Sequence, residues 1–401
     1  MRFKPFFLLA AVIIPTVVSS CSKLQSSQHD DALCEVAAPI DSLFNSLFRP
    51  NEPGAIVGIC VDGKPAYVKG FGLARLDNGA PYTDSTSTNI CSATKSFTTT
   101  AVMKLVEQGK LSLDQSIDEF FPNFNAPVFS HITIRHILSH TTGLPDKRPR
   151  NPDQWANYIK RHDSTFGISD DYMLYGREPE MIKYFESVDR LETEPGTQYR
   201  YQDPPFMLLS TVIEKASGMP FEKYMTDSIF APAGLTETRF FEPDSIIPNE
   251  AHGYGPADGL SEEDQFVSSD GKWEEYDYGE AAFFPTRADR GIYTTARDYF
   301  KWLQAIYSGK IINFDSISER YNWQVSTKLP NIGYGLGVFL QSKPDYPYKA
   351  FHMSYNGGFS IYQCYFPDQN IFMFVFSNRP DWDRLEIGKN IDKIFRQAEW
   401  I

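Results

Sequence analysis

A serine and a lysine three positions apart are the residues of this 401-residue chain best placed to do chemistry. They belong to the run Ser92-Ala93-Thr94-Lys95, and that spacing puts both side chains on one face of a helix, one turn apart. A serine hydroxyl is a weak nucleophile until a base or a neighbouring cation activates it, and a lysine one turn away can do so. At the start of a helix, Ser92 would also feel the positive end of the macrodipole. The pair is therefore a candidate for nucleophilic catalysis.

The surroundings of Ser92 separate it from the two other Ser-x-x-Lys matches in the chain. The match at 20–23 lies beside an expected cleavage site, and the match at 269–272 lies in an acidic stretch without helical periodicity. After Ser92, by contrast, apolar residues recur at helical spacing until Gly109, a residue type that commonly ends helices. The sequence predicts that Ser92 and Lys95 lie in the first turn of an amphipathic helix that follows a loop.

Strand patterns occur at both ends of the chain, and helical patterns lie between them. This order predicts an α+β fold: an antiparallel sheet from both ends of the chain packs with helices as an α/β sandwich, and an all-helical domain is inserted. We expect the sheet domain at 36–109 and 285–401 and the helical insertion at 110–284, with an acidic, aromatic-rich loop at 251–280 that is a solvated insertion or a wall of the substrate cleft. The predicted strands are 56–61, 66–71, 335–340, 360–366 and 371–377, and the predicted helices include 133–143, 206–218, 295–308 and 382–397.

The first twenty residues have the pattern of a secretory signal peptide. Two basic residues precede an apolar run at 6–14 that is too short to span a bilayer comfortably. Residues 18–21 resemble the lipobox of a bacterial lipoprotein, in which Cys21 is lipidated; the alternative is an ordinary signal peptidase site with an incidental cysteine. We expect 1–20 to be a lipoprotein signal peptide and 21–35 a polar tether, so that the protein is exported and lipid-anchored in the bacterial cell envelope.

The net charge indicates which classes of partner are unfavourable, and the cysteine spacing indicates whether disulfides are expected. The formal net charge of −13 becomes −15 when the two basic residues of the signal peptide are removed. A surface this acidic argues against nucleic acid and anionic lipid headgroups as partners. Four cysteines remain besides Cys21, and their spacing indicates no disulfide framework. Because Cys60, Cys91 and Cys364 lie in or beside apolar segments, we expect buried free thiols.

Two downstream segments follow the Ser92 run in a recognisable order. Residues 194–203 read Glu-Pro-Gly-Thr-Gln-Tyr-Arg-Tyr-Gln-Asp, and residues 352–359 read His-Met-Ser-Tyr-Asn-Gly-Gly-Phe. This order resembles the serine β-lactamases and penicillin-binding proteins, in particular their class C-like branch, which includes D-alanyl-D-alanine carboxypeptidases, D-aminopeptidases and esterases. The resemblance covers roughly residues 40 to 400, and further phrases similar to those of the family stand at 136–144, 291–298 and 334–337.

The resemblance implies a β-lactamase/transpeptidase-like fold and a two-step acyl transfer to water, with no metal and no organic cofactor. Ser92 would form the acyl-enzyme, and Lys95 and Tyr201 would manage its proton. The positive charge of Lys95 would favour a tyrosinate at Tyr201 or ease its proton transfer. The backbone N–H groups of Ser92 and Tyr355 would form the oxyanion hole.

Two positions depart from the pattern of the family. Asp203 stands where relatives carry asparagine; its carboxylate can pair with Lys95 but cannot donate to a substrate carbonyl. Ser354 replaces a glycine and adds a side chain beside the oxyanion hole. His352 stands where relatives carry Lys or His, and if it tunes the site, activity should change between about pH 5 and 8. The departures favour a D-amino-acid peptidase or an esterase, acting on an amide, peptide or ester, over an efficient β-lactamase.

Several alternatives stay open at this point. Asp203 has the pattern of a helix N-cap followed by proline, and His352 fits a strand-edge histidine. His136 and His140 have an i, i+4 spacing used in metal sites, but no glutamate follows the first histidine, and the phrase recurs in a metal-free family. At the level of function, a β-lactamase and a non-catalytic lipoprotein that binds peptidoglycan or a partner on the same fold are the alternatives. The sequence does not indicate an oligomeric state.

Overall fold

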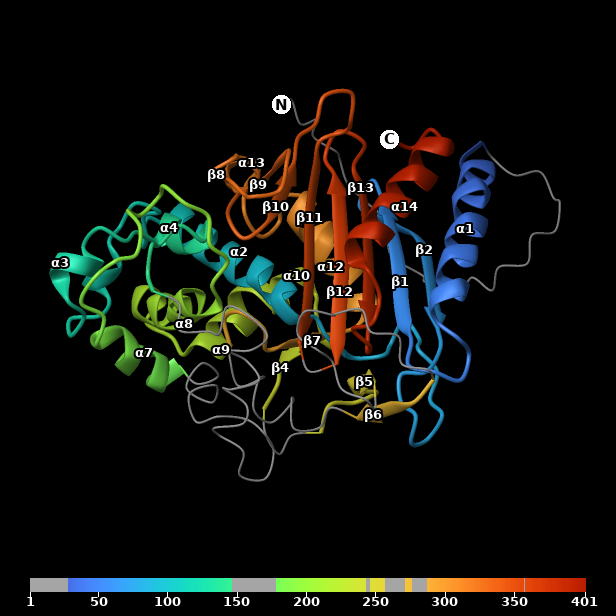
Figure 1. The fold of residues 1–401 in the computed structure, drawn as a ribbon, viewed down its shortest axis with the longest axis horizontal. Coiled ribbons are helices and arrows are strands. Elements are labelled where there is room, and N and C mark those ends of the chain that lie inside the picture. Colours follow the sequence, from blue (N-terminus) through green and yellow to red (C-terminus); the bar gives the residue numbers. More distant parts are fainter. Residues whose placement is uncertain (1–27, 146–177, 243–245, 257–270, 276–286, 357) are drawn as a thin grey trace.

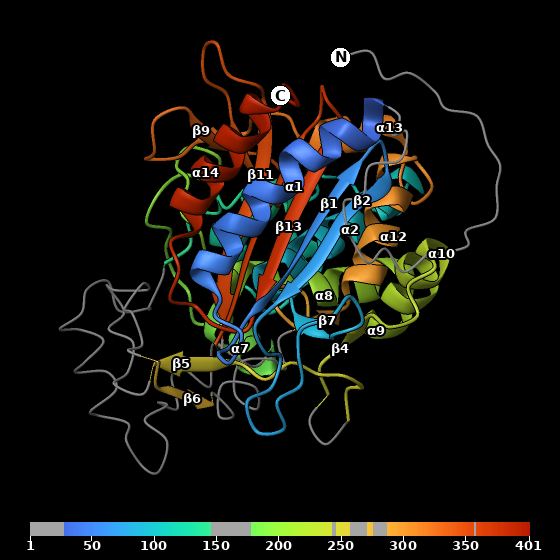
Figure 2. The same ribbon diagram turned by 90° about the vertical axis from the view of Figure 1, so that its right-hand side faces the viewer.

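A large antiparallel sheet organises the molecule. The structure, a computed structural model, describes residues 28–145, 178–242, 246–256, 271–275, 287–356 and 358–401. Eight strands form this sheet in the order β2-β1-β13-β12-β11-β10-β9-β8. Helices α1 (Gln28–Leu47) and α14 (Arg384–Gln397) cover one face, and α2 (Thr94–Glu107) and α12 (Ala296–Tyr307) cover the other (Figures 1 and 2). The predicted α+β sandwich is confirmed.

The two ends of the chain meet in the middle of this sheet. Strands β1 and β13 pair along their whole length, from Ala55 opposite Ser377 to Val61 opposite Ile371. Both strands are almost entirely apolar because helices cover both of their faces. The strands are β1 (Ala55–Val61), β2 (Lys64–Phe71), β8 (Val325–Ser326), β9 (Ile332–Tyr334), β10 (Phe339–Gln341), β11 (Lys349–Asn356), β12 (Phe359–Phe366) and β13 (Ile371–Ser377).

Two predicted boundaries are wrong. The single strand expected at 335–340 is mostly the turn between β9 and β10, in which Gly337 adopts a left-handed φ of 72°, and only its last two residues belong to β10. The polar tether expected at 21–35 overlaps α1, which begins at Gln28. The apolar residues Val36, Ile40 and Phe44 follow one another every four positions, and their burial against the sheet favours a helix there.

Predicted signals before residue 28, including Cys21, lie outside the described residues. Within the part of the chain that the structure describes, no helix combines the length and apolar character needed to cross a membrane.

The middle of the chain supplies a helical layer beside the sheet, on the left in Figure 1. Its helices pack around the buried side chains of α8. The predicted loop at 251–280 contains a two-stranded ribbon, β5 paired with β6, and residues 257–270 and 276–280 of that loop lie outside the described residues. The elements are α3 (Ala126–Phe129), α4 (Ile134–Leu138), α7 (Glu178–Glu186), α8 (Asp203–Ser217), α9 (Phe221–Met225), α10 (Ala231–Ala233), β4 (Arg239–Phe240), β5 (Tyr254–Pro256) and β6 (Trp273–Glu275).

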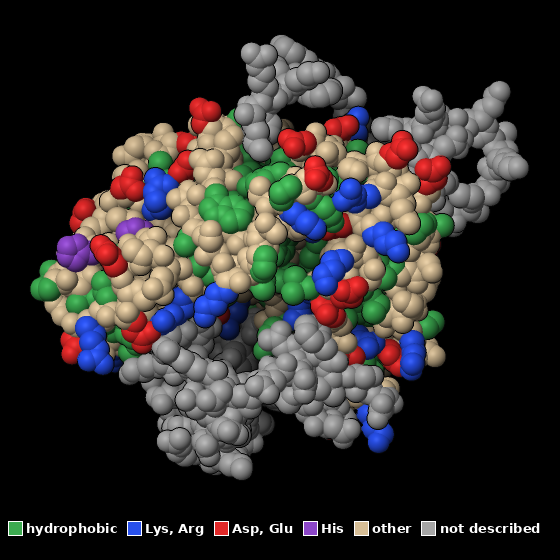
Figure 3. All heavy atoms as spheres, turned by 45° about the horizontal axis from the view of Figure 1, so that its top comes forward, with side chains coloured by type: hydrophobic (Ala, Val, Ile, Leu, Met, Phe, Trp, Pro, Cys, Tyr) green, Lys and Arg blue, Asp and Glu red, His purple; other side chains and the backbone are tan. Residues whose placement is uncertain are grey.

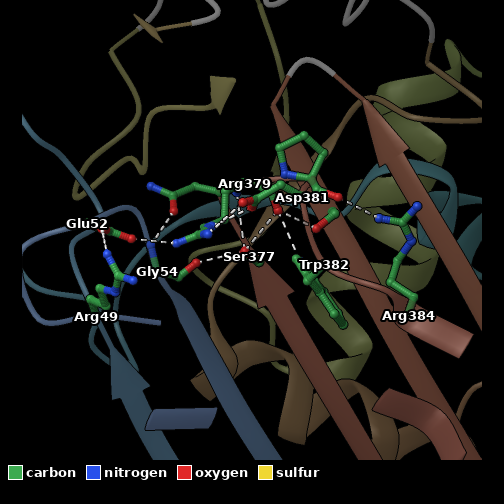
Figure 4. Close-up of polar contacts among 11 residues, drawn as sticks. Arg49, Glu52, Gly54, Ser377, Arg379, Asp381, Trp382 and Arg384 are labelled. Carbon is green, nitrogen blue, oxygen red and sulfur yellow. Dashed lines mark hydrogen bonds and ion pairs between the residues drawn. The ribbon is translucent and has the colours of Figure 1, made fainter. Parts of the chain in front are cut away.

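A polar cluster at one end of the sheet ties the first strand to the last helix. Arg379 donates to Glu52 Oε2 at 3.1 Å and to Asp381 Oδ2 at 2.6 Å, and Ser377 Oγ donates to the carbonyl oxygen of Gly54 at 2.8 Å (Figure 4). These contacts fix the segment that leads into α14. The guanidinium of Arg384, in the first turn of α14, consequently lies 5.7 Å from the centre of an aromatic ring of β11.

Candidate active site

Ser92 lies on a tight turn between a short strand and a long helix. The turn is the 3₁₀ helix η1 (Cys91–Ala93), which joins β3 (Thr88–Asn89) to α2. Cys91 has a φ of +49°, in the left-handed region that residues with a Cβ rarely adopt. Its N–H donates to Asn89 Oδ1 at 2.7 Å, which holds the turn in that shape. The prediction that Ser92 opens the α-helix is therefore off by one short turn, since α2 begins at Thr94.

Lys95 is completely buried and is surrounded by oxygen atoms. Its Nζ lies 3.1 Å from Ser92 Oγ, 2.7 Å from Asp203 Oδ1 and 3.3 Å from the carbonyl oxygen of Asp289. The rings of Tyr201 and Phe206 complete the surroundings, with their centres 5.2 and 5.4 Å from Nζ. A buried ammonium group needs such partners. The expected ion pair between Lys95 and Asp203 is confirmed.

Asp203 is the first residue of α8 rather than its N-cap. The N-cap is Gln202, and the first turn continues with two prolines. A carboxylate in the first turn of a helix is stabilised by the helix dipole, and here Asp203 also pairs with Lys95. The buried Gln202 side chain donates to the carbonyl oxygen of Leu144 at 3.0 Å and accepts from Thr142. Gln202 thus ties the start of α8 to the segment that follows α4.

Tyr201 contacts the nucleophile through its hydroxyl group. Burial and the neighbouring Asp203 carboxylate raise the pKa of Tyr201 well above its usual value, and a hydrogen bond with Ser92 offsets only part of that rise. The ring packs against the imidazole of His140, with ring centres 4.2 Å apart. Tyr201 therefore rests as a neutral phenol. The expectation of a tyrosinate favoured by Lys95 is wrong, because Asp203 places a negative charge beside the same ring.

Asp289 is a buried site residue that the sequence motifs do not single out. Its Oδ2 lies 4.0 Å from Lys95 Nζ and 3.0 Å from Arg290 Nε, and its side chain is fully buried. The residue precedes β7 (Ile292–Thr294), and β7 pairs with β3 directly before the Ser92 turn. The sequence signal that could have identified Asp289 is its position two residues before the family-like segment at 291–298.

Strand β11 lies along the other side of Ser92, because it packs against η1. Neighbouring residues of a strand point to opposite faces, so His352 and Ser354 face the α2 layer while Tyr355 faces α14. Ser354 Oγ lies against the thiol of Cys91. Tyr355 is 40% exposed, and its backbone stands beside the Ser92 turn.

His352 is buried and stands opposite Gln363 of β12, one residue beyond the last pair of β10 with β11, Phe339 with Phe351. Neither ring nitrogen has a hydrogen-bond partner among the described residues. Burial, followed by the charge of Lys95, lowers the pKa of His352 to about 3. This pKa keeps the imidazole neutral between pH 5 and 8, so we expect no contribution of its titration to activity in that range, unlike the expectation from the sequence.

Other residues noted from the sequence have structural positions. Thr133 and His136 form a capping box at the start of α4, with the Thr133 N–H donating to His136 Nδ1 at 3.2 Å, so capping explains that histidine. Within the described ranges, no three His, Cys, Asp or Glu side chains come together as metal ligands. The free, buried state predicted for Cys60, Cys91 and Cys364 is confirmed. On the face drawn in Figure 3, acidic and basic side chains are interspersed.

Comparisons with known proteins agree with this geometry. Residues 40–394 match the Beta-lactamase family. Penicillin-binding protein 4* of Bacillus subtilis (strain 168) is 26% identical over 335 residues, which cover 80% of this chain and 67% of that protein. The structure of the D-amino acid amidase from Ochrobactrum anthropi SV3, complexed with D-phenylalanine, is similar with a TM-score of 0.71 and 22% identity, over 91% of this chain and 99% of that one.

A penicillin-binding protein from Bacillus halodurans has the same fold, with a TM-score of 0.69 and 24% identity, over 88% of this chain and 99% of that one. The chain spans about two thirds of the length of the Bacillus subtilis relative. The family match covers nearly all of the sheet, the helical layer and the three segments around Ser92. The chain therefore belongs to the Beta-lactamase family and is a serine hydrolase with the β-lactamase/transpeptidase fold.

Proposed function

We propose that this protein hydrolyses an amide, peptide or ester of a D-amino acid through an acyl-enzyme on Ser92, and that it is a poor β-lactamase. The observation that carries the proposal is the 2.7 Å contact from Lys95 Nζ to Asp203 Oδ1. In place of an asparagine amide, this carboxylate holds Lys95 as an ammonium and offers no donor to an acyl-amide carbonyl of the substrate. The similarity to a D-amino acid amidase supports the choice of substrate class.

The resting state of Tyr201 suggests how the Ser92 proton is moved. Because Tyr201 is a neutral phenol, it acts as a relay: its oxygen accepts the Ser92 proton while its own proton passes to the leaving nitrogen or oxygen of the substrate. The Ser92 Oγ–carbon bond forms, the bond to the leaving group breaks, and no charge accumulates on the phenol. In deacylation a water molecule attacks the acyl carbon and gives a proton to Tyr201. Tyr201 returns its own proton to Ser92 Oγ as the bond between that oxygen and the acyl carbon breaks.

Lys95 and the backbone supply electrostatic stabilisation. The ammonium group lies 3.1 Å from Ser92 Oγ and stabilises negative charge as that oxygen attacks. The N–H groups of Ser92 and Tyr355 are the proposed oxyanion hole, since the Ser92 turn packs against β11. Ser354 adds a hydroxyl-bearing side chain to the same strand, where it narrows the room beside this hole.

Covalent labelling tests the proposal directly. Incubation with a fluorophosphonate should add one probe mass that maps to Ser92, and the Ser92→Ala variant should remain unlabelled. Wild-type enzyme should turn over D-amino acid amides or p-nitrophenyl esters faster than a chromogenic cephalosporin. Brisk cephalosporin hydrolysis that is lost in Ser92→Ala would identify a β-lactamase instead. A folded protein that no acylating probe labels would identify a binding protein that has kept the fold.

We further propose that the mature protein is anchored in the cell envelope through a lipidated Cys21. The support is the lipobox-like run at 18–21 and the apolar segment before it. Labelling of expressing bacteria with an alkyne fatty acid should tag the wild-type protein but not Cys21→Ser. An untagged wild-type protein with a mature N-terminus other than residue 21 would show an ordinary signal peptidase site.

A further inference from the structure

Arg320 is a buried cation that pairs with no carboxylate of the described residues. It ends helix α13 (Phe314–Arg320), and it is 3% exposed. Its guanidinium donates to two hydroxyl oxygens of α2, from Nη1 to Thr100 Oγ1 at 3.1 Å and from Nη2 to Ser96 Oγ at 2.9 Å. The remaining nitrogen, Nε, has no hydrogen-bond partner in the described part of the chain. An arginine keeps its charge when buried, so this arrangement is unfavourable unless something else compensates the charge.

A small cavity lies next to this guanidinium, between α2, α12 and the sheet. Its volume is about 30 Å³, and Arg320 and Ser96 form part of its wall. A buried water molecule needs roughly 10–15 Å³ of such space, so the cavity has room for about two waters or one monatomic anion. Aromatic side chains form half of the remaining wall, among them Trp302, Tyr365 and Phe372.

The polar groups around the cavity are hydrogen-bond donors and carry no negative charge. The amide oxygen of Gln363 accepts from the Tyr299 hydroxyl, which leaves the amide N–H₂ without a partner among the described residues. The hydroxyls of Tyr307 and Tyr321 lie 2.7 Å apart, so one proton of the pair is free to be donated elsewhere. No carboxylate is present in the wall.

The tyrosines cannot supply the missing negative charge either. Burial raises the pKa of Tyr307 and Tyr321 above the usual value for a phenol, so both hydroxyls stay protonated. A guanidinium N–H, an amide and a phenol therefore line a cavity with a net positive charge. This is the chemistry of an anion site and not of a cation site.

We propose that this cavity binds one monatomic anion, with chloride as the expected ligand, held by Arg320 Nε, the Gln363 amide and a tyrosine hydroxyl. The small volume of the cavity favours a monatomic anion over phosphate or sulfate, and its aromatic side chains suit a weakly hydrated halide. The anion would compensate the guanidinium that holds Ser96 and Thr100 and would stabilise α2 directly after the Ser92 turn. The proposal does not depend on the reaction catalysed at Ser92.

Thermal unfolding of the full chain at constant ionic strength tests this site. Replacing gluconate by chloride or bromide up to about 200 mM should raise Tm by about 2–4 °C in a saturable manner, as expected for a ligand that binds only the folded state. Arg320→Met should abolish the rise. The matched control is Arg297→Met, which removes an exposed arginine that pairs with Asp84 and should keep the halide effect.

Crystals grown in bromide give an independent measurement. Anomalous density should lie within hydrogen-bonding distance of Arg320 Nε. If Arg320→Met does not fold, Gln363→Met should weaken the halide effect on Tm several-fold. A Tm independent of halide in the wild type, or water alone at this position in the bromide crystals, would overturn the proposal.

Discussion

Two buried cations lie along helix α2, and they are compensated in opposite ways. Lys95 contacts the Asp203 carboxylate at 2.7 Å and lies 4.0 Å from that of Asp289. Among the described residues, the side-chain hydrogen-bond partners of Arg320 are two hydroxyl groups, and its guanidinium lines a small cavity. The first cation lies among carboxylates, one of which is shared with Arg290, whereas the second has no carboxylate partner among the described residues. The comparison teaches that the surroundings of Lys95 are built to keep it charged, whereas those of Arg320 require a further ligand.

The largest expected effect follows from removing the Lys95 charge. Lys95→Met removes the cation that pairs with the Asp203 carboxylate, while Asp289 keeps Arg290, and breaking a buried ion pair in this way costs about 3–5 kcal/mol of folding free energy. The rate of Ser92 acylation should fall about 10²- to 10⁴-fold, because the cation next to Oγ is lost. Urea unfolding and fluorophosphonate labelling measure the two effects.

Arg320→Met is the matched comparison for stability. It removes a cation without leaving a carboxylate unpaired, so it should cost only about 1–3 kcal/mol for the lost hydrogen bonds. Equal losses of stability in the two methionine variants would contradict the contrast between the sites.

The next largest effect concerns Asp203 and the pH dependence of acylation. After burial, the Asp203 charge is the largest cause of the raised pKa of Tyr201. In Asp203→Asn the pKa of Tyr201 falls toward its usual value, so the phenol loses its proton at a lower pH. The alkaline limb of the acylation profile should therefore move to lower pH. A limb that stays in place in this variant would remove Tyr201 from the relay.

The architecture could be predicted from the sequence, whereas the charge balance at Lys95 could not. The hairpin at 55–71 and the strands at 359–377 are marked by continuous apolar runs with turn residues between them. The Ser92, Tyr201 and His352 segments are marked by motifs. Asp289 carries no such mark, because its contact with Lys95 depends on the pairing of β7 with β3.

The state of Tyr201 and His352 was equally hidden from the sequence. Residue types and spacing give the distance between groups on one helix, but they do not give burial or the net charge of partners from distant segments. Lys95 and Asp203 are 108 positions apart, and the Asp203 charge adds to burial in raising the pKa of Tyr201.

A smaller effect is expected for Asp289. Its carboxylate is farther from Lys95 Nζ than that of Asp203 and is shared with Arg290. Asp289→Asn should move the alkaline limb in the same direction as Asp203→Asn, but by less, and should slow acylation by about 3- to 10-fold. Acylation rates measured against pH for both variants provide the test. A larger shift in Asp289→Asn would reverse the assignment of the main counter-ion.

The smallest effect on catalysis between pH 5 and 8 is expected for His352→Gln. The ring is neutral over this range, since its folded-state pKa is about 3, so the shape of the activity profile should not change.

The acid stability of the fold should change instead. The unfolded chain binds a proton at a histidine pKa near ~6.5 and the folded protein does not, so His352 makes the fold lose stability as pH falls from about 6.5 toward 3. His352→Gln should flatten that loss in urea unfolding measured at several pH values. A profile of activity that loses an inflection near pH 6 in this variant would show instead that His352 titrates in the working enzyme.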